Sequence, residues 1–444
     1  MCVSNSNANV GKEKYAGRFG AIMSMAGMCV GMGNVWRFPY MVGAYGGGAF
    51  VLAYLLCVVV VVAPLAIMEC GIGKGFGKGM IDVYSDTLHS KKAGKAVGGL
   101  FSFGYYSMNF FYFSIVAASL YFVFASATSM WKTVPAVEIY DKLTVNYPLL
   151  AVIVVVLVLF TSYIVYKGVA NGIEAVSKIM MPLMIAFLVI AILFGVFFID
   201  NIEAGYEFLF KPDFSKLLSF DMWVAAMGQA CFSIGVGAGC ILVYGSHLGK
   251  NSDVTLNMLT VSLFDTCVGM LAGMAIVPAC VAMGLSPEAG SKLIFVVLPS
   301  LFEILPAGAL MGILVFVAIF FAGITSAIAQ LEVIVASFVS SFNWSRLKTV
   351  FIFGGLNIIA AVIAVYSTKF FDFWNMVSGN YVFIVSAGVG AIVFGWVFGI
   401  ERIRTEFLNP TSDIQLGKWY TYFTKFVAIP IMLVMMLNSL FPFL

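Results

Sequence analysis

The sequence predicts an all-α polytopic membrane protein whose spans form two inverted halves. Of its 444 residues, 62% are hydrophobic and 10% are charged, whereas soluble domains carry about 25% charged residues. Its apolar segments run for roughly 20 residues, the length that a helix needs to cross a bilayer core. Glycine clusters interrupt two of these segments at corresponding places. A β-barrel is excluded because barrel strands alternate in hydrophobicity.

Eleven segments are apolar enough to be spans. They lie near residues 19–45, 49–72, 98–130, 148–166, 174–199, 221–247, 255–283, 299–339, 348–367, 374–399 and 419–442. This pattern divides the chain into a cytoplasmic N-terminal segment, a first repeat of five spans, a second repeat of five spans, and a cytoplasmic loop with the eleventh span. The four parts cover residues 1–18, 19–200, 201–400 and 401–444.

Lysine and arginine predict the orientation, because they accumulate in cytoplasmic loops. Sixteen lie in the loops on the side of the N-terminus and seven in the loops on the other side. We therefore expect a plasma (inner) membrane protein with a cytoplasmic N-terminus and, after eleven spans, an extracytoplasmic C-terminus. The polar start lacks an apolar region with a cleavage site, so no cleaved signal peptide is expected.

Two spans contain signals for a broken helix. The first contains Gly27, Gly31, Gly33 and the polar Asn34, and the sixth contains GQACFSIGVGAG at residues 228–239. A lone glycine would more simply allow close helix packing. Paired clusters favour unwound backbone, which is tolerated at membrane depth only where it lines a cavity or is buried in protein. Because each half has five spans, the halves must be inverted, and paired breaks then indicate a midplane substrate and ion site in a secondary transporter.

The sequence around these breaks resembles the neurotransmitter:sodium symporter family. GRFGAIMSMAGMCVGMGNVWRFPYMVGAYGGGAF resembles the first-helix signature, and GQACFSIGVGAG, FFAGITSAIAQ and FDFWNMVSGNY resemble the sixth, eighth and tenth helices. The similarity extends over essentially the whole chain and is closest to the eleven-helix bacterial form. It implies a LeuT-like fold of five plus five inverted spans. It also implies a symporter that uses sodium to import an amino acid by alternating access.

The resemblance implies a substrate pocket at the two breaks. The carboxylate would meet amides near Gly31 and Gly33 and the hydroxyl of Tyr112, because positive helix ends favour anions. The amino group would meet carbonyls near Phe232, Ser233 and Gly235. Glycine at position 31, where monoamine transporters have Asp, favours an α-amino acid. The side chain would contact Met28, Met32, Met108, Phe232, Ala238, Ser326 and Gln330.

The pocket residues favour a bulky hydrophobic or aromatic amino acid of the tyrosine, tryptophan, phenylalanine or leucine type. Ala238 and Gly235 replace larger residues of the leucine-transporting relative, and methionines adapt to irregular shapes. Gln330 either bonds a phenol or indole or pairs with a helix carbonyl.

Two sodium sites are implied, built from the oxygen ligands that hard cations prefer. The first would contain Cys29, Asn34, Ser233 and Asp265, and the second Gly27, Val30, Ala322, Thr325 and Ser326. Without the family context, Thr325 and Ser326 would more simply bond the preceding helical turn.

Asp265 lies deep in the seventh span, where an ionisable residue is costly and indicates function. Chloride-dependent relatives have Asn there and bind an anion nearby, so the carboxylate would replace chloride. We expect no chloride requirement, and protonation of Asp265 during the return step is a hypothesis. The simpler alternative is a neutral Asp bonded to a neighbouring helix.

The gates are also implied by the resemblance. Arg37 and Asp372 match the external pair, with Phe232 as an aromatic lid above Tyr112. The cytoplasmic side departs from the family pattern: Lys12 is present, but its acidic partner is replaced by Ser340, so the usual salt bridge cannot form. His247 and Tyr15 replace the usual Tyr and Trp. Glu69 is expected to bond exposed backbone of the sixth span.

Other functions lack their residues. The two histidines, His89 and His247, cannot supply a zinc triad, and there is no H-E-x-x-H or G-x-S-x-G motif. A channel would need a ring of selectivity groups. A transporter-like amino-acid sensor without turnover remains as the alternative. A net charge of +3 does not indicate nucleic acid as a partner; membrane lipid and the amino acid are the expected partners, and the oligomeric state stays open.

Overall fold

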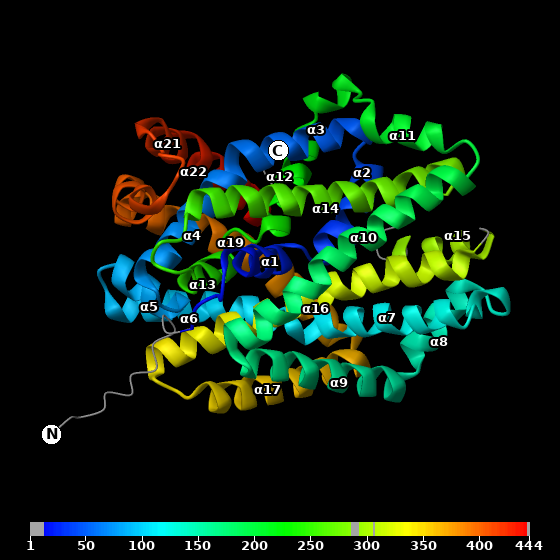
Figure 1. The fold of residues 1–444 in the computed structure, drawn as a ribbon, viewed down its shortest axis with the longest axis horizontal. Helices are drawn as coiled ribbons and strands as arrows, with labels where there is room; N and C mark the ends of the chain where they lie inside the picture. The colour runs from blue at the N-terminus through cyan, green and yellow to red at the C-terminus, as the bar shows by residue number, and fades with distance from the viewer. Residues whose placement is uncertain (1–12, 286–292, 305–306, 442–444) are drawn as a thin grey trace.

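The computed structural model describes residues 13–285, 293–304 and 307–441, which form a bundle of long helices (Figure 1). The N-terminal segment from residue 13, helix α5 (Met80–Thr87) and the loop 248–253 lie at one end, named here the N-terminal face. Helices α8 (Ala136–Val145), α11 (Ile202–Phe210) and α15 (Leu298–Ile304) lie at the other end, the opposite face. Lys12 and its expected role lie outside the described residues.

Nine helical stretches of the described chain are long and apolar enough to cross a membrane. A tenth crossing is added if a pair of helices bent by 56° counts as one span. The bent pair is the predicted first span, Arg18–Cys29 and Gly33–Ala44. The predicted sixth span falls on two shorter helices and passes this test in neither. Eleven spans therefore stay a prediction.

The first half of the chain contains the elements up to α10. They are α1 (Arg18–Cys29), η2 (Gly33–Arg37), α2 (Phe38–Ala44), α3 (Gly48–Cys57), η3 (Val58–Val62), α4 (Ala63–Phe76), α5, α6 (Lys91–Ser107), α7 (Asn109–Ala127), η4 (Met130–Lys132), α8, α9 (Tyr147–Tyr166), η5 (Val169–Glu174) and α10 (Ala175–Phe198).

The second half begins with α11. It continues with η6 (Phe214–Leu218), α12 (Phe220–Ile234), α13 (Cys240–Ser246), α14 (Val254–Ala282), η7 (Leu293–Val297), α15, α16 (Gly308–Phe342), α17 (Arg346–Tyr366), α18 (Thr368–Trp374), η8 (Asn375–Val382), α19 (Phe383–Gly390), η9 (Ala391–Gly399), α20 (Ile400–Ile403), η10 (Arg404–Leu408), η11 (Asn409–Thr411), α21 (Lys418–Phe423), η12 (Thr424–Ala428) and α22 (Ile429–Leu440).

Both predicted breaks are present. After α1, Val30 is extended, with φ −69° and ψ 106°. Between α12 and α13, Gly235, Gly237 and Gly239 have φ values of +79°, +85° and +77°, a conformation that side chains other than glycine rarely adopt. The glycine clusters of the sequence therefore mark real interruptions of helical hydrogen bonding.

Two groups of helices enclose the breaks. Helices α3, α4, α12, α13 and α14 pack against one another, and α7, α9, α16 and α17 form a second group. The buried α16 belongs to the second group and also contacts α13 of the first group. Large apolar side chains cover the outside of the bundle, including Val59, Phe197 and Phe351. A surface of this kind fits lipid, where all backbone polar groups of a helix are satisfied internally.

The predicted span near 299–339 differs from the structure. A short helix, α15, precedes α16, which begins only at Gly308 and continues to Phe342. Ala307 at the start of α16 has a φ of +55°, which is incompatible with continuous helix. The apolar run that predicted one span therefore contains a turn.

Candidate functional site

The two helix breaks lie against each other in the middle of the bundle. The thiol of Cys29 donates to the carbonyl of Ile234 over 3.1 Å, and Gln229 Nε2 donates to the carbonyl of Gly33 over 2.8 Å. These bonds cross-link the first break to the sixth-span break. Freed carbonyl and amide groups from both segments thus surround one point.

A small cavity of about 30 Å³ opens at this point. The residues around it come from both breaks and from α6, α7, α16 and α19: Met28, Cys29, Gly31, Met32, Gly33, Tyr105, Met108, Tyr112, Phe232, Gly235, Ser326, Gln330 and Phe383. The backbone amide of Met32 donates to the hydroxyl of Tyr112 over 3.4 Å. The side-chain oxygen Oε1 of Gln330 is buried and accepts no hydrogen bond from the described residues.

Most of the predicted pocket residues line this cavity, but Ser233 and Ala238 do not. Ala238 follows Gly237, whose amide donates to Glu69 Oε1 over 2.8 Å. A Cβ at Gly237 would lie 2.1 Å from the Cα of Ala387, so this segment is packed onto α19 and away from the cavity. The proposed widening of the pocket by Ala238 therefore has no counterpart in the cavity wall.

Tyr105 and Phe383 line the cavity but were missed from the sequence. Tyr105 lies one turn before Met108, and Phe383 contacts Phe232 with a ring distance of 5.4 Å. Tyr105 could have been found from the sequence, because it lies one helical turn before Met108, a predicted pocket residue. No sequence signal linked Phe383, 151 residues after Phe232, to the same wall.

Beside the cavity, Asn34, Ser233 and Asp265 form a buried polar cluster. The side-chain nitrogen Nδ2 of Asn34 lies 2.8 Å from Ser233 Oγ, 2.9 Å from Asp265 Oδ1 and 3.0 Å from the backbone carbonyl oxygen of Asp265. The hydroxyl of Ser233 donates to Asp265 Oδ2 over 2.6 Å. These three side chains, each at most 2% exposed, are brought together from three different spans.

A second set of oxygen atoms lies between α1 and α16. The hydroxyl of Ser326 donates to the carbonyl of Val30 over 3.5 Å, and Thr325 donates to the carbonyls of Phe321 and Ala322. A Cβ at Gly27 would lie 3.4 Å from the Cβ of Thr325. Thr325 thus makes the bond to the preceding turn that the simpler reading expects, while Ser326 reaches across to the break.

Above the cavity, a wide vestibule of about 530 Å³ leads toward the opposite face. Arg37 and Asp372 both line it, together with Met32, Gly33, Trp36, Tyr40, Met108, Phe111, Tyr112, Ile115, Tyr140, Phe232, Phe295, Phe371, Asn375 and Gly379. Arg37 lies over the ring of Phe232 at 5.4 Å and donates to the carbonyl of Gly228. No ion pair within 4.0 Å joins Arg37 to Asp372, both of which the structure describes.

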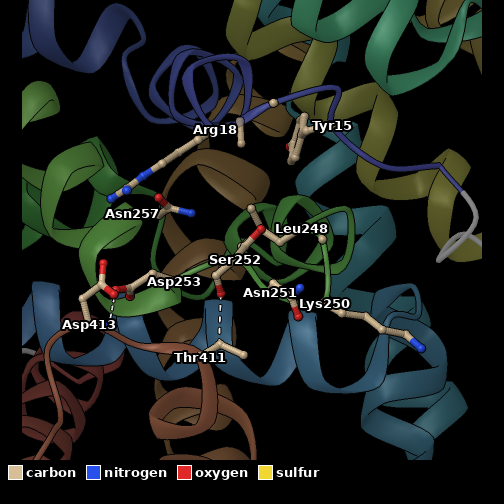
Figure 2. Close-up of a pocket in the computed structure, with 13 residues that line it drawn as sticks. Tyr15, Arg18, Leu248, Lys250, Asn251, Ser252, Asp253, Asn257, Thr411 and Asp413 are labelled. Atoms are coloured by element: carbon tan, nitrogen blue, oxygen red, sulfur yellow. Dashed lines mark hydrogen bonds between the residues drawn. The ribbon is translucent and has the colours of Figure 1, made fainter.

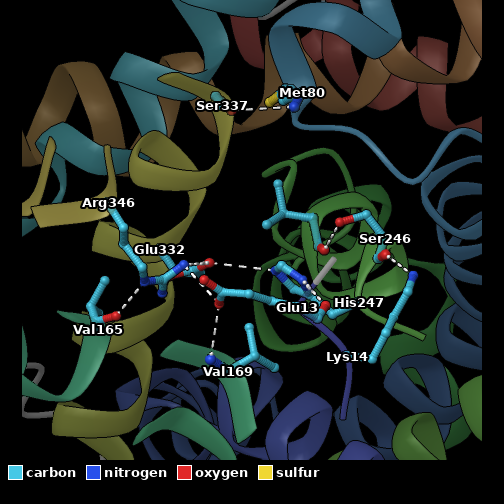
Figure 3. Close-up of polar contacts among 11 residues, drawn as sticks. Glu13, Lys14, Met80, Val165, Val169, Ser246, His247, Glu332, Ser337 and Arg346 are labelled. Carbon is cyan, nitrogen blue, oxygen red and sulfur yellow. Dashed lines mark hydrogen bonds and ion pairs between the residues drawn. The ribbon is translucent and has the colours of Figure 1, made fainter. Parts of the chain in front are cut away.

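On the N-terminal face, an ionic cluster of buried and partly buried residues closes the molecule. We name it the closing network: Glu13, Lys14, His247, Glu332 and Arg346 (Figure 3). Arg346 pairs with Glu332 and lies 3.1 Å from Glu13 Oε2. Lys14 donates to the carbonyls of Ser246 and Leu248 over 2.9 Å each. Burial, and then the charge of Lys250, lower the pKa of Lys14.

The predicted departures on this face are explained by these contacts. Ser340 carries no charge and so forms no salt bridge; its hydroxyl donates a hydrogen bond to Asp82 of α5. The backbone amide of Met80, also in α5, donates to the hydroxyl of Ser337 over 3.2 Å. The ion pairs of Arg346 with Glu13 and Glu332 thus take the place of the salt bridge that Ser340 cannot form. Glu69 accepts from the backbone of the sixth-span break, as expected.

A separate pocket of about 470 Å³ opens on the N-terminal face between the N-terminal segment, loop 248–253 and residues 411–413 (Figure 2). Its walls are held by Thr411, which donates to the carbonyl of Ser252, and by the amide of Asp413, which donates to Asp253 Oδ2. It shares no lining residue with the central cavity. The central cavity therefore communicates with the vestibule and not with this pocket.

The chain is similar to known sodium-dependent transporters along nearly its whole length. The model of the sodium:neurotransmitter symporter family matches residues 12–142 and 136–443. An uncharacterized sodium-dependent transporter of Methanocaldococcus jannaschii is 30% identical over 95% of this chain and 89% of its own length. An uncharacterized sodium-dependent transporter of Haemophilus influenzae is 28% identical over 98% of this chain and 99% of its own.

Among solved structures, MhsT in complex with L-phenylalanine superposes with a TM-score of 0.85 at 28% identity, over 96% of this chain and 99% of that one. Similarity along nearly the full length, together with two broken helices around a central cavity, leads to one assignment. The chain belongs to the sodium:neurotransmitter symporter family.

Proposed function

We propose that this chain is a sodium-coupled symporter for a hydrophobic or aromatic L-amino acid and that it needs no chloride. Family membership makes it a sodium-dependent, multi-pass membrane transporter and not an enzyme. The observation that carries the finer proposal is the cavity between the two breaks, where backbone dipoles, the hydroxyl-bearing residues Tyr105, Tyr112 and Ser326, and a mostly apolar wall converge.

The end of the cavity beside Gly31 suits the substrate carboxylate. Its donors are the Tyr112 hydroxyl and the backbone amides that follow the first break, where the helix dipole favours an anion. A Cβ at Gly31 would lie 2.6 Å from Ser326 Oγ, so the space exists only because position 31 is glycine. The amino group would then face carbonyls of Phe232, Ser233 and Gly235, because the sixth-span break supplies no competing positive charge.

The polar cluster beside this end is the proposed first sodium site. Asn34, Ser233 and Asp265 would offer side-chain oxygens, and Cys29 a backbone carbonyl, at the boundary of the cavity. Sodium favours such oxygen ligands. Since the same site would touch the substrate carboxylate, binding of the ion and of the amino acid would reinforce each other.

The oxygens between α1 and α16 are the proposed second sodium site. The carbonyls of Gly27, Val30 and Ala322 and the hydroxyls of Thr325 and Ser326 would be its ligands. Bonding of Ser326 to Val30 supports this grouping. An ion here would tie α1 to α16 and so favour one arrangement of the two groups of helices.

Chloride independence is proposed from Asp265. A fixed carboxylate bonded to Asn34 and Ser233 supplies beside the sodium site the negative charge that chloride would otherwise bring. Intramembrane carboxylates of this kind also serve in proton relays, so return of the empty carrier with a proton on Asp265 is part of the proposal.

The wall of the cavity supports a large substrate side chain. Met28, Met108, Tyr105 and Phe383 make it flexible and aromatic, since unbranched methionine side chains fill irregular gaps. Gln330 contributes a buried acceptor without a partner, which suits a phenol or an indole N–H. L-phenylalanine is bound by MhsT, which favours the aromatic class here.

The arrangement of openings supports alternating access. We infer that the N-terminal face is cytoplasmic, from the lysine and arginine bias, so the vestibule opens to the outside while the closing network seals the inside. Arg37 and Asp372, which both line the vestibule, would approach each other above a bound substrate, with Phe232 as the lid. The protein would then release its cargo by opening the N-terminal face.

The test is binding of each of the twenty amino acids to purified protein, in sodium or potassium, with chloride or gluconate. The proposal expects binding of an aromatic or large aliphatic amino acid that needs sodium and ignores chloride. Sodium-independent binding, preference for a decarboxylated amine, or a chloride requirement would each overturn the corresponding part. Sodium-driven uptake into proteoliposomes separates a symporter from a sensor, which would bind without flux.

A further inference from the structure

His247 is a buried histidine that the proposed transport cycle does not use. It caps the C-terminal end of α13 and is 1% exposed. Its Nδ1 lies 3.1 Å from the carbonyl oxygen of Glu13, and its Nε2 lies 3.4 Å from Oε1 of Glu332 (Figure 3). Nδ1 thus has a hydrogen-bond partner, whereas Nε2 is buried beside a carboxylate oxygen and makes no hydrogen bond with the described residues.

A neutral imidazole cannot satisfy both neighbours, because it carries one N–H and one bare nitrogen. The carbonyl of Glu13 has no proton to donate. Glu332 is paired with Arg346 through both carboxylate oxygens, which keeps it ionised and accepting. A bare ring nitrogen would thus face either a carbonyl or a carboxylate, whereas an imidazolium donates to both.

The charges around the ring come from the N-terminal segment, α16 and α17. Glu332 from α16 is the carboxylate that faces the ring, whereas the carboxylate of Glu13, which is partly exposed, pairs with Arg346 from α17. Arg346 and Lys14 balance the two carboxylates. Lys14 is committed to the carbonyls of Ser246 and Leu248.

The remaining neighbours do not change this balance. Glu174 from η5 is paired with Lys178. Tyr15 packs edge-on against the histidine ring, and burial raises the pKa of its hydroxyl well above the usual value, so it stays neutral. Tyr244 from α13 and Cys70 from α4 lie close to Tyr15. Buried charges are costly unless they are paired, and a second N–H on the ring gives the buried Glu332 a further donor beside Arg346.

We propose that His247 is a proton-binding site of the closed N-terminal face, and that it takes up a proton from the water on that side when the face closes and returns it when the face opens. The proton supplies the second N–H of the ring, so that one ring nitrogen donates to the carbonyl of Glu13 and the other to Glu332. On opening, the N-terminal segment leaves α16, water replaces the two oxygen partners, and the proton passes to that water.

The consequence is a closed face that responds to pH. Acid on the N-terminal side stabilises closure, and alkali favours opening, because the closed state binds one proton more. Release of cargo to that side slows as its pH falls. The conformational part of this inference rests on the proposed alternating access, whereas the protonation of His247 does not.

The first test reads the protonation of the ring directly. The chain has two histidines, so protein labelled with 15N-histidine gives two sets of ring signals, and the His89→Asn variant leaves those of His247 alone. Asn suits position 89, where φ is +53°. We expect both ring nitrogens of His247 to carry protons at about pH 7, near which a free histidine loses its charge. One unprotonated ring nitrogen at that pH would overturn the proposal.

The second test measures closure by hydrogen exchange of three amides that depend on the network. Tyr15 donates to the carbonyl of His247, Ala16 to Glu174 and Val169 to Glu13. In the native chain, protection corrected for intrinsic exchange should fall from about pH 6 to about pH 8, the range in which histidine titrates. His247→Gln should lower the protection at the acid end by roughly tenfold, as loss of a charge-assisted bond does, and abolish its pH dependence.

The His89→Asn chain is the matched control and should behave as the native chain does. Equal pH dependence in His247→Gln would contradict the proposal, since Asp265 or another group would then be responsible. Neither measurement uses an amino-acid substrate. A chain that failed to bind or transport one would contradict the proposed function and leave both results on His247 as they were.

Discussion

Gly31 lies at the interruption of the first helix, next to Ser326 and Tyr112 in the cavity wall. A Cβ at this position would be 2.6 Å from Ser326 Oγ and 3.5 Å from the Tyr112 hydroxyl. The first distance is far shorter than atoms tolerate without displacement. One methyl group therefore removes the space that the proposed carboxylate needs.

We expect Gly31→Ala to weaken amino-acid binding by roughly 10- to 100-fold, because overpacking a buried site costs about 1–3 kcal/mol. Isothermal titration in sodium measures the effect. Gly99→Ala is the control, because Gly99 lies in α6 with nothing within 4 Å of the added methyl. Unchanged affinity in Gly31→Ala would place the carboxylate elsewhere.

Gln330 supplies a buried oxygen on the cavity wall without a partner among the described residues. We expect Gln330→Leu, which has a similar volume, to weaken binding of tyrosine or tryptophan by about 2- to 10-fold while phenylalanine is affected less, since a lost hydrogen bond costs about 0.5–1.5 kcal/mol. Competition with labelled phenylalanine gives the ratio. Equal losses for all three would mean that the oxygen does not contact the substrate.

Single residues differ in how well the sequence predicted them. Asn34, Ser233 and Asp265, each a polar residue in an apolar span, lie together in the structure, and their role as sodium ligands stays a prediction. Ala238 was expected on the cavity wall from the family resemblance alone, yet it does not line the cavity, and Glu69 bonds the neighbouring Gly237. The partners of His247 lie 234 and 85 residues away in the chain, and no local pattern links them.

At the scale of elements, the sixth-span break depends on one carboxylate. Glu69 of α4 accepts from the amide of Gly237, while its second oxygen has no partner among the described residues. The break exposes backbone groups that a regular helix would satisfy. Glu69 thus replaces part of the missing helical bonding.

We expect Glu69→Ala to destabilise the protein by about 1–3 kcal/mol, because it leaves a buried amide without an acceptor. The loss should appear as a lower Tm in detergent. Glu69→Gln keeps a carbonyl oxygen for Gly237 and should lose less than half as much. If both variants lost equally, the charge of Glu69 would matter more than the bond.

Elements were predicted where sequence periodicity decides them. The long apolar runs gave the spans, and the glycine clusters gave both interruptions, because glycine changes backbone preference locally. The break before α16 escaped prediction from hydrophobicity, although Pro306 and Gly308 on either side of Ala307 are turn signals in the sequence. Hydrophobicity alone does not show where an apolar run stops being helical.

For the whole molecule, the number of crossings follows from the treatment of α12 and α13. They have 15 and 7 residues, too few for either to span a bilayer core of about 30 Å. Counted together as one interrupted crossing, they bring the total from ten to eleven. The parity decides on which side the C-terminus lies.

We expect protease-cleavable tags at the two ends of the chain to lie on opposite sides of the membrane, the N-terminal tag on the cytoplasmic side. In inside-out vesicles, added protease should remove the N-terminal tag alone. In spheroplasts it should remove the C-terminal tag alone. Removal of both tags from the same preparation would mean an even number of crossings and would contradict the eleven-span topology.

The positive φ values between α12 and α13 also determine how this protein can change over generations. Substitutions at Gly235, Gly237 or Gly239 meet both a forbidden backbone conformation and atoms within 3.0 Å. Met28, Tyr105 and Phe383, by contrast, line the same cavity from regular helices. Selection for a new substrate should therefore collect mutations on the helical wall and leave the three glycines untouched.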